Sequence, residues 1–272
     1  MSTPCGAARV DTAGRPGFHG GMCGRYKLVA LDEETADAMG VPFVAPGPRY
    51  NIAPTQAAPV VRVGASGDRE WAEPRWGLVP PFAKDASAGA RMINARSETL
   101  ADRPAFREAL LRRRCLVPAD GFYEWRKDPG GGHRQPFLVR RADARPFVFA
   151  GLWERWMPPG GEPLLTFTIL TTAPNALVAR LHDRMPVILP RDAFGPWLDP
   201  GLREASRLLP MLAPAPDSGW EAVPVGPYVG NPSLDAPICA RPLADDPAAP
   251  GGPRDPGSPR GQQDLFQRGR LA

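Results

Sequence analysis

"RRCLVPADGFYEW", residues 113–125, decides the fold class of this 272-residue chain. The stretch is short, rich in β-branched and aromatic residues, and punctuated by Pro, Asp and Gly, which is the pattern of strands rather than of a long helix. Runs of the same kind recur along the sequence and are bounded in the same way. We therefore predict strands over "APVVRV" (58–63), "QPFLVRR" (135–141), "PFVFAGLWERW" (146–156), "LLTFTILTT" (164–172) and "MPVIL" (185–189).

Helical patterns are fewer. Residues 32–40 begin with acidic residues and end on Gly40, and residues 103–113 have apolar residues spaced by three and four. Residues 173–182 and 192–198 read as short helical turns. The sequence thus predicts an α+β protein with one domain, in which antiparallel sheet forms a barrel-like body and the helices are few and short.

Composition limits the class of protein. With 43% hydrophobic residues the chain can bury a sizeable core, and no window approaches eighteen uninterrupted apolar residues. Residues 1–21 lack the apolar centre of a secretory signal, so we expect a soluble, cytoplasmic protein without a membrane partner. The formal charge of +4 and pI near 9.1 fit a polyanionic partner without requiring one. Nothing in the sequence suggests more than a monomer.

The chain ends differ from its middle. Residues 1–21 and 243–272 are rich in Gly, Pro, Ala and Arg and have almost no apolar periodicity, which is typical of disordered segments. We expect the folded domain to span 22–242. The four cysteines of the chain form no C-x-x-C pair, and the chain has 3 histidines. We therefore expect no disulfide framework, metal site or cofactor. The cysteines are Cys5, Cys23, Cys115 and Cys239.

Four stretches carry polar residues that a strand or loop would not need for folding. Each has an ordinary structural explanation: a small buried hydrophobe for Cys23, a turn residue for Asn94, a capping or core histidine for His182. Glu124 sits among aromatic residues, where an unpaired carboxylate is costly, so burial with a partner is expected whether or not it is catalytic. The stretches are "MCGRY" (22–26), "MINARSETL" (92–100), "ADGFYEWRK" (119–127) and "LTTAPNALVARLHDRMPVIL" (170–189).

Taken together and in this order, these stretches resemble the SRAP family, the SOS-response-associated peptidases or abasic-site processing proteins. Six segments carry the resemblance across nearly all of residues 22–240: "MCGRY", "RYNIAPTQ" (49–56), "RWGLVPPFAKD" (75–85), "INARSET" (93–99), "ADGFYEW" (119–125) and "LTTAPN" with "LHDRMPVIL" (170–175, 181–189). The resemblance implies one mixed α+β domain that binds single-stranded DNA and cross-links itself to abasic sites through a cysteine that becomes residue one.

Position explains why a cysteine would be used. An N-terminal cysteine offers an amine and a thiol on adjacent carbons, so the amine can form a Schiff base with the open-chain aldehyde and the thiol can close a thiazolidine ring. A terminal amine has a pKa of about 8, so a useful share is neutral at cytoplasmic pH. The resemblance therefore implies that Met22 is the true start, or that residues 1–21 are removed.

The remaining roles also come from the resemblance. It implies proton transfer by Glu124, opening of the sugar ring with acid from His182, and hydrogen bonds from Asn94 to the terminal amine or the sugar. DNA contacts are expected from Arg25, Arg96 and Arg184 to phosphates, from Trp76 with Pro54 to exposed bases, and from Thr171. Phe82 stands where many relatives have tryptophan and keeps an aromatic ring there.

The tail holds one further motif, "QQDLF" at 262–266. It looks like the short peptide that bacterial replication proteins insert into the sliding clamp, with Leu265 and Phe266 filling a pocket and Gln262 and Asp264 beside them. The sequence thus predicts the clamp as a second partner.

Two other functions stay open at this stage. The first is a thiol peptidase or amidohydrolase in which Glu124 or His182 activates Cys23, with removal of residues 1–21 as its minimal form. The second is a non-covalent single-strand binding module, for which the arginines and Trp76 suffice.

Overall fold

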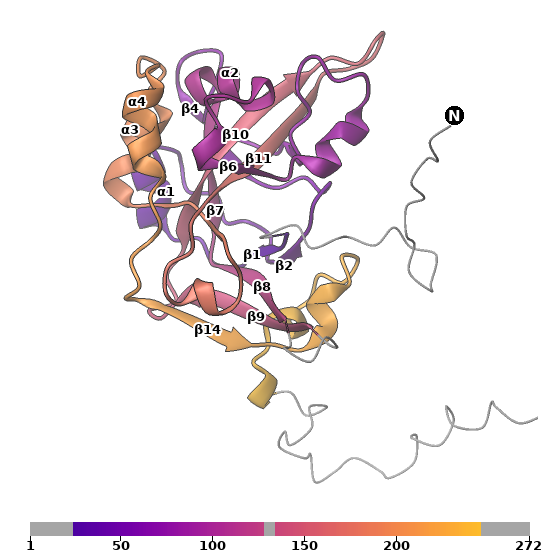
Figure 1. Ribbon diagram of the computed structural model, residues 1–272, viewed down its shortest axis with the longest axis vertical. Helices are drawn as coiled ribbons and strands as arrows, with labels where there is room; N and C mark the ends of the chain where they lie inside the picture. The colour runs from indigo at the N-terminus through magenta and orange to yellow at the C-terminus, as the bar shows by residue number, and fades with distance from the viewer. Residues whose placement is uncertain (1–23, 128–133, 246–272) are drawn as a thin grey trace, which may run out of the picture.

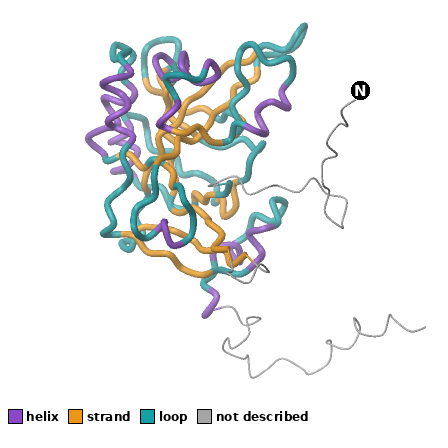
Figure 2. The backbone as a smooth tube through the Cα atoms, in the orientation of Figure 1, coloured by secondary structure: helices purple, strands orange, loops and turns teal. Residues whose placement is uncertain are grey.

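Two mainly antiparallel sheets form the body of the protein in the computed structural model, which describes residues 24–127 and 134–245 (Figures 1 and 2). The smaller sheet has the strand order β14-β9-β8-β1-β2. Its strands are β1 (Tyr26–Leu28), β2 (Arg49–Ile52), β8 (Gly121–Lys127), β9 (Arg134–Arg141) and β14 (Trp220–Pro224).

The larger sheet has the order β12-β11-β10-β7-β3-β4, with β13 paired to β10 and both β5 and β6 paired to β11. The pairings of β5 and β6 with β11 are parallel, whereas the other pairings in this sheet are antiparallel. Its strands are β3 (Val60–Val63), β4 (Arg69–Ala72), β5 (Arg75–Trp76), β6 (Asn94–Arg96), β7 (Arg114–Ala119), β10 (Phe147–Trp156), β11 (Leu164–Thr172), β12 (Met185–Pro186) and β13 (Ile188–Leu189).

The helices are short and lie outside the sheets (Figure 2). In the first, Asp32 caps the N-terminus by accepting from the Thr35 amide, and Gly40 ends the helix with a φ of 74°. The α-helices are α1 (Glu33–Met39), α2 (Pro104–Arg112), α3 (Phe194–Leu198) and α4 (Ala205–Leu208), and the 3₁₀ helices used below are η3 (Val178–Arg180), η6 (Pro227–Gly230) and η7 (Pro237–Ala240).

Aromatic rings join the two sheets. Phe122 of β8 packs edge-on against Phe147 and Phe149 of β10, at centroid distances of 6.5 and 6.1 Å. Tyr26 of β1 packs in the same way against Phe149 and Trp76. Burial of such rings supplies much of the hydrophobic stabilisation, and their edge-to-face geometry adds to it. The core therefore fixes the position of β1 and β8 over the larger sheet.

The predicted fold class is confirmed: the protein is α+β, mainly antiparallel, with few short helices. The predicted strands appear, and the run at 185–189 is split between two partners. Met185–Pro186 pairs with β11 and Ile188–Leu189 pairs with β10. Val187 lies between them, because its amide donates to the Leu170 carbonyl of β11 and its carbonyl accepts from the Ala150 amide of β10. The helix expected at 173–182 is reduced to η3.

Within residues 24–127 and 134–245, no helix is both long enough and apolar enough to cross a bilayer.

Candidate functional site

The start of β1 lies beside Glu124 of β8. The antiparallel register pairs Tyr26 with Phe122, and the Tyr123 amide donates to the Arg25 carbonyl at 2.9 Å. Continuing this register brings Gly24 opposite Glu124. Side chains alternate along a strand, so Glu124 is on the same face as Phe122, the face that packs on the larger sheet. Glu124 is 2% exposed, which makes it a buried carboxylate at the end of the inter-sheet core.

The Arg25 side chain is held by hydrogen bonds to β2 and to η6. Its guanidinium donates to the Val229 carbonyl at 2.5 Å and to Asn51 Oδ1 at 3.3 Å. Burial lowers the pKa of Arg25 below its ordinary value, and the nearby Cys239 thiol acts in the opposite direction. Arg25 thus fixes the chain one residue after Gly24, and its donors are at least partly engaged by the protein.

Asn51 organises this wall of the site. Its fully buried amide nitrogen donates to the carbonyl oxygens of Val229, Asn231 and Leu234 at 3.3, 2.9 and 2.8 Å. Because its oxygen also accepts from Arg25, one side chain ties β2, the start of β1 and the 229–234 segment together. Asn51 was not predicted from the sequence. The available signal was a polar amide between Tyr50 and Ile52 in a short strand.

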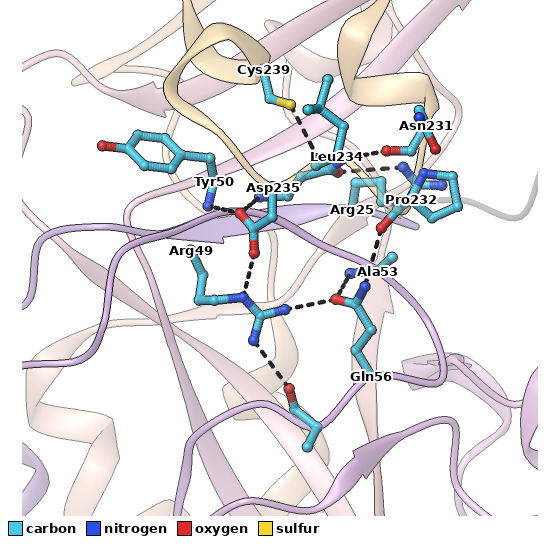
Figure 3. Close-up of polar contacts among 12 residues, drawn as sticks. Arg25, Arg49, Tyr50, Ala53, Gln56, Asn231, Pro232, Leu234, Asp235 and Cys239 are labelled. Carbon is cyan, nitrogen blue, oxygen red and sulfur yellow. Dashed lines mark hydrogen bonds and ion pairs between the residues drawn. The ribbon is translucent and has the colours of Figure 1, made fainter.

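An ion pair extends the same wall (Figure 3). Arg49 pairs with Asp235 at 2.5 Å, and Arg49 also donates to Gln56 Oε1 at 2.7 Å. Asp235 accepts in addition from the amides of Tyr50 and Asn51, and Gln56 donates to the Pro232 carbonyl at 3.2 Å. The segment 231–235 is therefore fastened to β2 by charge-assisted hydrogen bonds.

Asn94 belongs to the larger sheet, and His182 lies in a loop between η3 and β12 beside it. Asn94 opens β6, where it pairs with Ile169 of β11, and Thr171 two residues along pairs with Arg96. His182 follows η3, and its backbone amide donates to the Val178 carbonyl at 2.9 Å. Both residues thus lie at the end of the sheet at which β11 finishes, where β6 and the 182–184 loop meet.

Arg184 sets the conformation of the histidine loop. Its guanidinium makes a two-pronged contact with Glu98, at 2.5 and 2.7 Å, and also donates to the Thr171 carbonyl at 2.9 Å. The hydrogen bond from Arg184 holds the pKa of Glu98 below its ordinary value. The loop is therefore tied to β11 and to the segment that follows β6.

The imidazole of His182 is oriented by its neighbours. Nδ1 lies 3.2 Å from the Arg184 backbone nitrogen, whose N–H can donate to it when that ring nitrogen carries no proton. Asp183 Oδ1 lies 2.8 Å from the same nitrogen and can pair with it when the ring is protonated. His182 can therefore present an Nε2–H donor, as a proton-transfer group needs.

Trp76 lies between the start of β1 and the region of Asn94. Its ring contacts Tyr26 at 5.2 Å, and its Nε1 donates to the Ile93 carbonyl at 2.8 Å, so it connects the residue after Arg25 to the residue before Asn94. Trp76 is 0% exposed. This corrects the expectation that it stacks on bases: the ring is a core bridge and offers no surface to DNA.

The other expected DNA contacts fall into two groups. Thr171 is fully buried and its hydroxyl donates to the Ala95 carbonyl, so a direct contact from that side chain is also corrected; Pro54 is buried as well. Arg96 is exposed, whereas Arg184 is mostly covered and engaged by Glu98. Phe82 is 67% exposed and is the aromatic ring available at the surface of this loop.

Five of the expected residues lie outside the described residues: Cys23 at the proposed centre and Gln262, Asp264, Leu265 and Phe266 of the tail motif. Among the residues that the structure describes, no cluster of three or more His, Cys, Asp or Glu side chains could hold a metal ion. Cys115 is buried and far from reactive, because burial raises the pKa of its thiol above the ordinary value.

The fold matches solved structures. A protein from Bacteroides thetaiotaomicron superposes with a TM-score of 0.70 at 24% identity, over 81% of this chain and 99% of that one. A protein from Bordetella bronchiseptica gives a TM-score of 0.64 at 31% identity, over 75% of this chain and 100% of that one. These matches place the fold in a known class of mixed α+β domain.

The family model for SOS response associated peptidases (SRAP) matches residues 22–232, and the chain belongs to this family. Abasic site processing protein YoqW of Bacillus subtilis is 40% identical over 221 residues, covering 79% of this chain and 97% of the relative. Abasic site processing protein HMCES of Gallus gallus is 32% identical over 227 residues, covering 72% of this chain and 66% of the relative.

Proposed function

We propose that this protein binds single-stranded DNA and forms a covalent cross-link with abasic sites through Cys23, as the first residue of the working protein. The observation that carries the proposal is the register of β1 on β8, which sets Gly24 opposite the buried Glu124. The two relatives named above are both called abasic site processing proteins, which supports the substrate class.

Chain connectivity supports the choice of Cys23. Consecutive Cα atoms are about 3.8 Å apart, and Cα atoms of opposed residues in antiparallel strands are about 4.5 to 5.5 Å apart. A residue bonded to Gly24 therefore has its Cα within roughly 10 Å of the Cα of Glu124. A glutamate side chain spans much of that distance. The family match begins at Met22, which supports a chain whose first residue after methionine removal is Cys23.

The cross-link forms in two steps, imine formation with loss of one water and ring closure by the thiol. The Cys23 amine attacks the aldehyde carbon of the open deoxyribose, and loss of water gives an imine. The Cys23 thiol then adds to the imine carbon, its proton passes to the imine nitrogen, and a thiazolidine closes. Glu124 is the proton carrier for the loss of water and for reversal. His182 donates from Nε2 to the ring oxygen as the closed sugar opens, and Asn94 holds the amine or a sugar hydroxyl.

The test compares two forms of the protein, one starting at Met1 and one prepared to start at Cys23. Each is mixed with a single strand carrying one abasic site, and the denatured product is separated on a gel. The form starting at Cys23 should give a shifted, heat-stable band, and Cys23→Ala in that form should give none. A band of equal yield from both forms would overturn the requirement for a free terminal amine.

Glu124→Gln tests the proton-transfer role of the carboxylate. This variant keeps the volume of the side chain and should slow cross-linking by roughly 100-fold or more, with unchanged affinity for an intact strand. Equal cross-linking rates for the parent and the Glu124→Gln protein would remove Glu124 from the mechanism.

The family description, with its word peptidase, favours a second candidate activity, cleavage of the chain before Cys23 by the site itself. It predicts that the form starting at Met1 loses residues 1–22 during incubation and that Glu124→Gln retains them. Retention of the full mass in both proteins would exclude self-cleavage.

The tail motif supports a separate proposal, binding to the replication sliding clamp through Leu265 and Phe266. The proposal rests on the sequence, in which Leu265 and Phe266 follow Gln262 and Asp264 in an otherwise polar tail. Replacing both by alanine should abolish capture by the immobilised clamp and leave cross-linking unchanged. Capture of the double variant at the parent level would overturn it.

A further inference from the structure

A second, positively charged pocket lies away from the candidate site. It has a volume of about 780 Å³, and arginines dominate its charged wall. Its floor comes from β3, β7 and β10, and the end of α2 and the start of β11 close its sides. The charged and aromatic lining residues are Arg62, Arg112, Arg114, Trp153, Arg155 and Glu162.

Arg114 forms a fixed, charged part of this wall. It is 4% exposed, and its guanidinium donates to the carbonyls of Leu110, Trp197 and Asp199. Burial lowers its pKa to about 10, with Asp199 opposing the shift, so the side chain stays charged at neutral pH. Because its bonds go to carbonyl oxygens, the positive charge is held in place without a carboxylate hydrogen-bonded to it.

Arg62 is positioned by an aromatic ring. Its guanidinium carbon lies 4.4 Å from the centre of the Trp153 ring, and one of its terminal nitrogens pairs with Glu70 at 2.7 Å. The Nε atom of Arg62 is buried and has no hydrogen-bond partner within residues 24–127 and 134–245. The ring thus helps to hold the Arg62 guanidinium at the pocket wall, where Glu70 pairs with it.

Arg112 and Arg155 stand at the open edge. Arg112 pairs with Glu108 at 3.5 Å, with both side chains more than half exposed, and such a pair contributes little in water. Arg155 is exposed. The pocket lining has four arginines and one carboxylate, Glu162. A phosphate group can therefore replace Glu108 as the partner of Arg112 and accept charge-assisted hydrogen bonds.

The pocket and the candidate site lie at opposite ends of β11. Leu165 borders the pocket, and Thr171 contacts the residues around Asn94 and Arg184. Six residues of strand span about 20 Å, a distance that several nucleotides of a DNA strand can cover. Figure 1 shows α2 and the far end of the β10–β11 hairpin on one side of β6, and β1, β2 and β8 on the other.

We propose that this arginine pocket binds backbone phosphates of the DNA that flanks the abasic site. The proposal rests on the proposed function, since it takes the candidate site as the place where the lesion is held. Arg112 and Arg155 contact the phosphates directly, and Arg62 and Arg114 supply the fixed charge behind them. The contacts are blind to sequence, because they reach the backbone and not the base edges.

The test uses strands of two lengths that carry a tetrahydrofuran, an abasic analogue without the reactive aldehyde. A strand of about 5 nucleotides ends before the pocket, whereas one of about 25 extends past it. Binding is measured by fluorescence anisotropy over a salt series, for the parent, for Arg112→Ala/Arg155→Ala, and for Arg107→Ala/Arg207→Ala. The last variant removes the same charge from two exposed arginines outside the pocket.

For the pocket variant we expect about a tenfold loss of affinity for the long strand at low salt. The slope of log affinity against log salt should fall by about 1.4, at about 0.7 for each lost contact with a single strand. Affinity for the short strand should stay at the parent level. Equal losses of affinity in both double variants, or a loss of affinity for the short strand as well, would overturn the proposal. It would also be overturned if inorganic phosphate bound the pocket without weakening the binding of the long strand.

A separate readout keeps the two proposals apart. Cross-linking of a short strand with a reactive abasic site should be the same in the pocket variant and the parent. If the parent does not cross-link and the long strand still loses affinity in the pocket variant, the cross-linking proposal fails and the pocket stands.

Discussion

Replacing Asn51 by alanine should destabilise the fold and disorder the wall that holds Arg25. The two N–H groups of the Asn51 amide are shared among the carbonyls of Val229, Asn231 and Leu234, and its oxygen accepts from Arg25. The variant therefore loses about three hydrogen bonds inside a site that is fully buried, at about 1 kcal/mol each. The free energy of unfolding should fall by about 3 kcal/mol, with a drop in Tm of roughly 6 to 12 °C for a domain of this size.

Ser233→Ala is the matched control. Ser233 lies in the same segment and is exposed, and its backbone amide, not its hydroxyl, donates to Asn231. We expect a change within about 0.5 kcal/mol for this variant. Both proteins are unfolded in urea and by heat, and the cross-linking rate is measured well below each Tm.

Asn51→Ala should also cross-link more slowly than Ser233→Ala, because Arg25 loses one of its two acceptors next to the start of β1. A loss of stability below 1 kcal/mol for Asn51→Ala, or a loss equal to that of Ser233→Ala, would refute the reasoning that this amide joins β1, β2 and the 229–234 segment.

Three further predictions follow from the site. Trp76→Ala should cost about 3 to 5 kcal/mol of stability, because a fully buried ring is removed, yet the folded fraction should bind an intact single strand like the parent; weakened binding at full folding would restore a role in base stacking. His182→Gln should slow cross-linking by about 100-fold, and a rate equal to that of the parent would contradict the acid role. Glu98→Gln should lower stability by less than about 1 kcal/mol, since the carboxylate is half exposed. Arg184 holds the pKa of Glu98 below its ordinary value of 4.5, so this contribution is present above pH 4.5 and is lost as the pH falls through the lower folded value; a difference between parent and variant that persists at pH 2 would contradict the assignment.

Strands with strong alternation or long apolar runs could be predicted from the sequence. Residues 146–156 and 164–172 correspond to β10 and β11 almost to the residue. In contrast, β4 and β14 were missed, because Arg69–Ala72 and Trp220–Pro224 are short edge strands without a long apolar run. Their pairing is set by tertiary contacts that local pattern does not contain.

The candidate site was predictable in part. Glu124 could be singled out because a carboxylate among aromatic residues needs a reason, and the structure buries it beside the start of β1. Trp76 was misjudged, because residue type alone does not tell a core ring from a surface ring. Asn51 escaped because its partners are carbonyls about 180 residues away, which only the folded chain brings to it.

The central claim is that Cys23, as a free N-terminus, carries the DNA. The most direct measurement is the intact mass of the protein from its native host, taken before and after reaction with a single strand that holds one abasic site. The account predicts a chain that begins at Cys23 and, after reaction, one added strand minus one water, with no adduct in Cys23→Ala. A chain that keeps residues 1–21 and forms no adduct would contradict it.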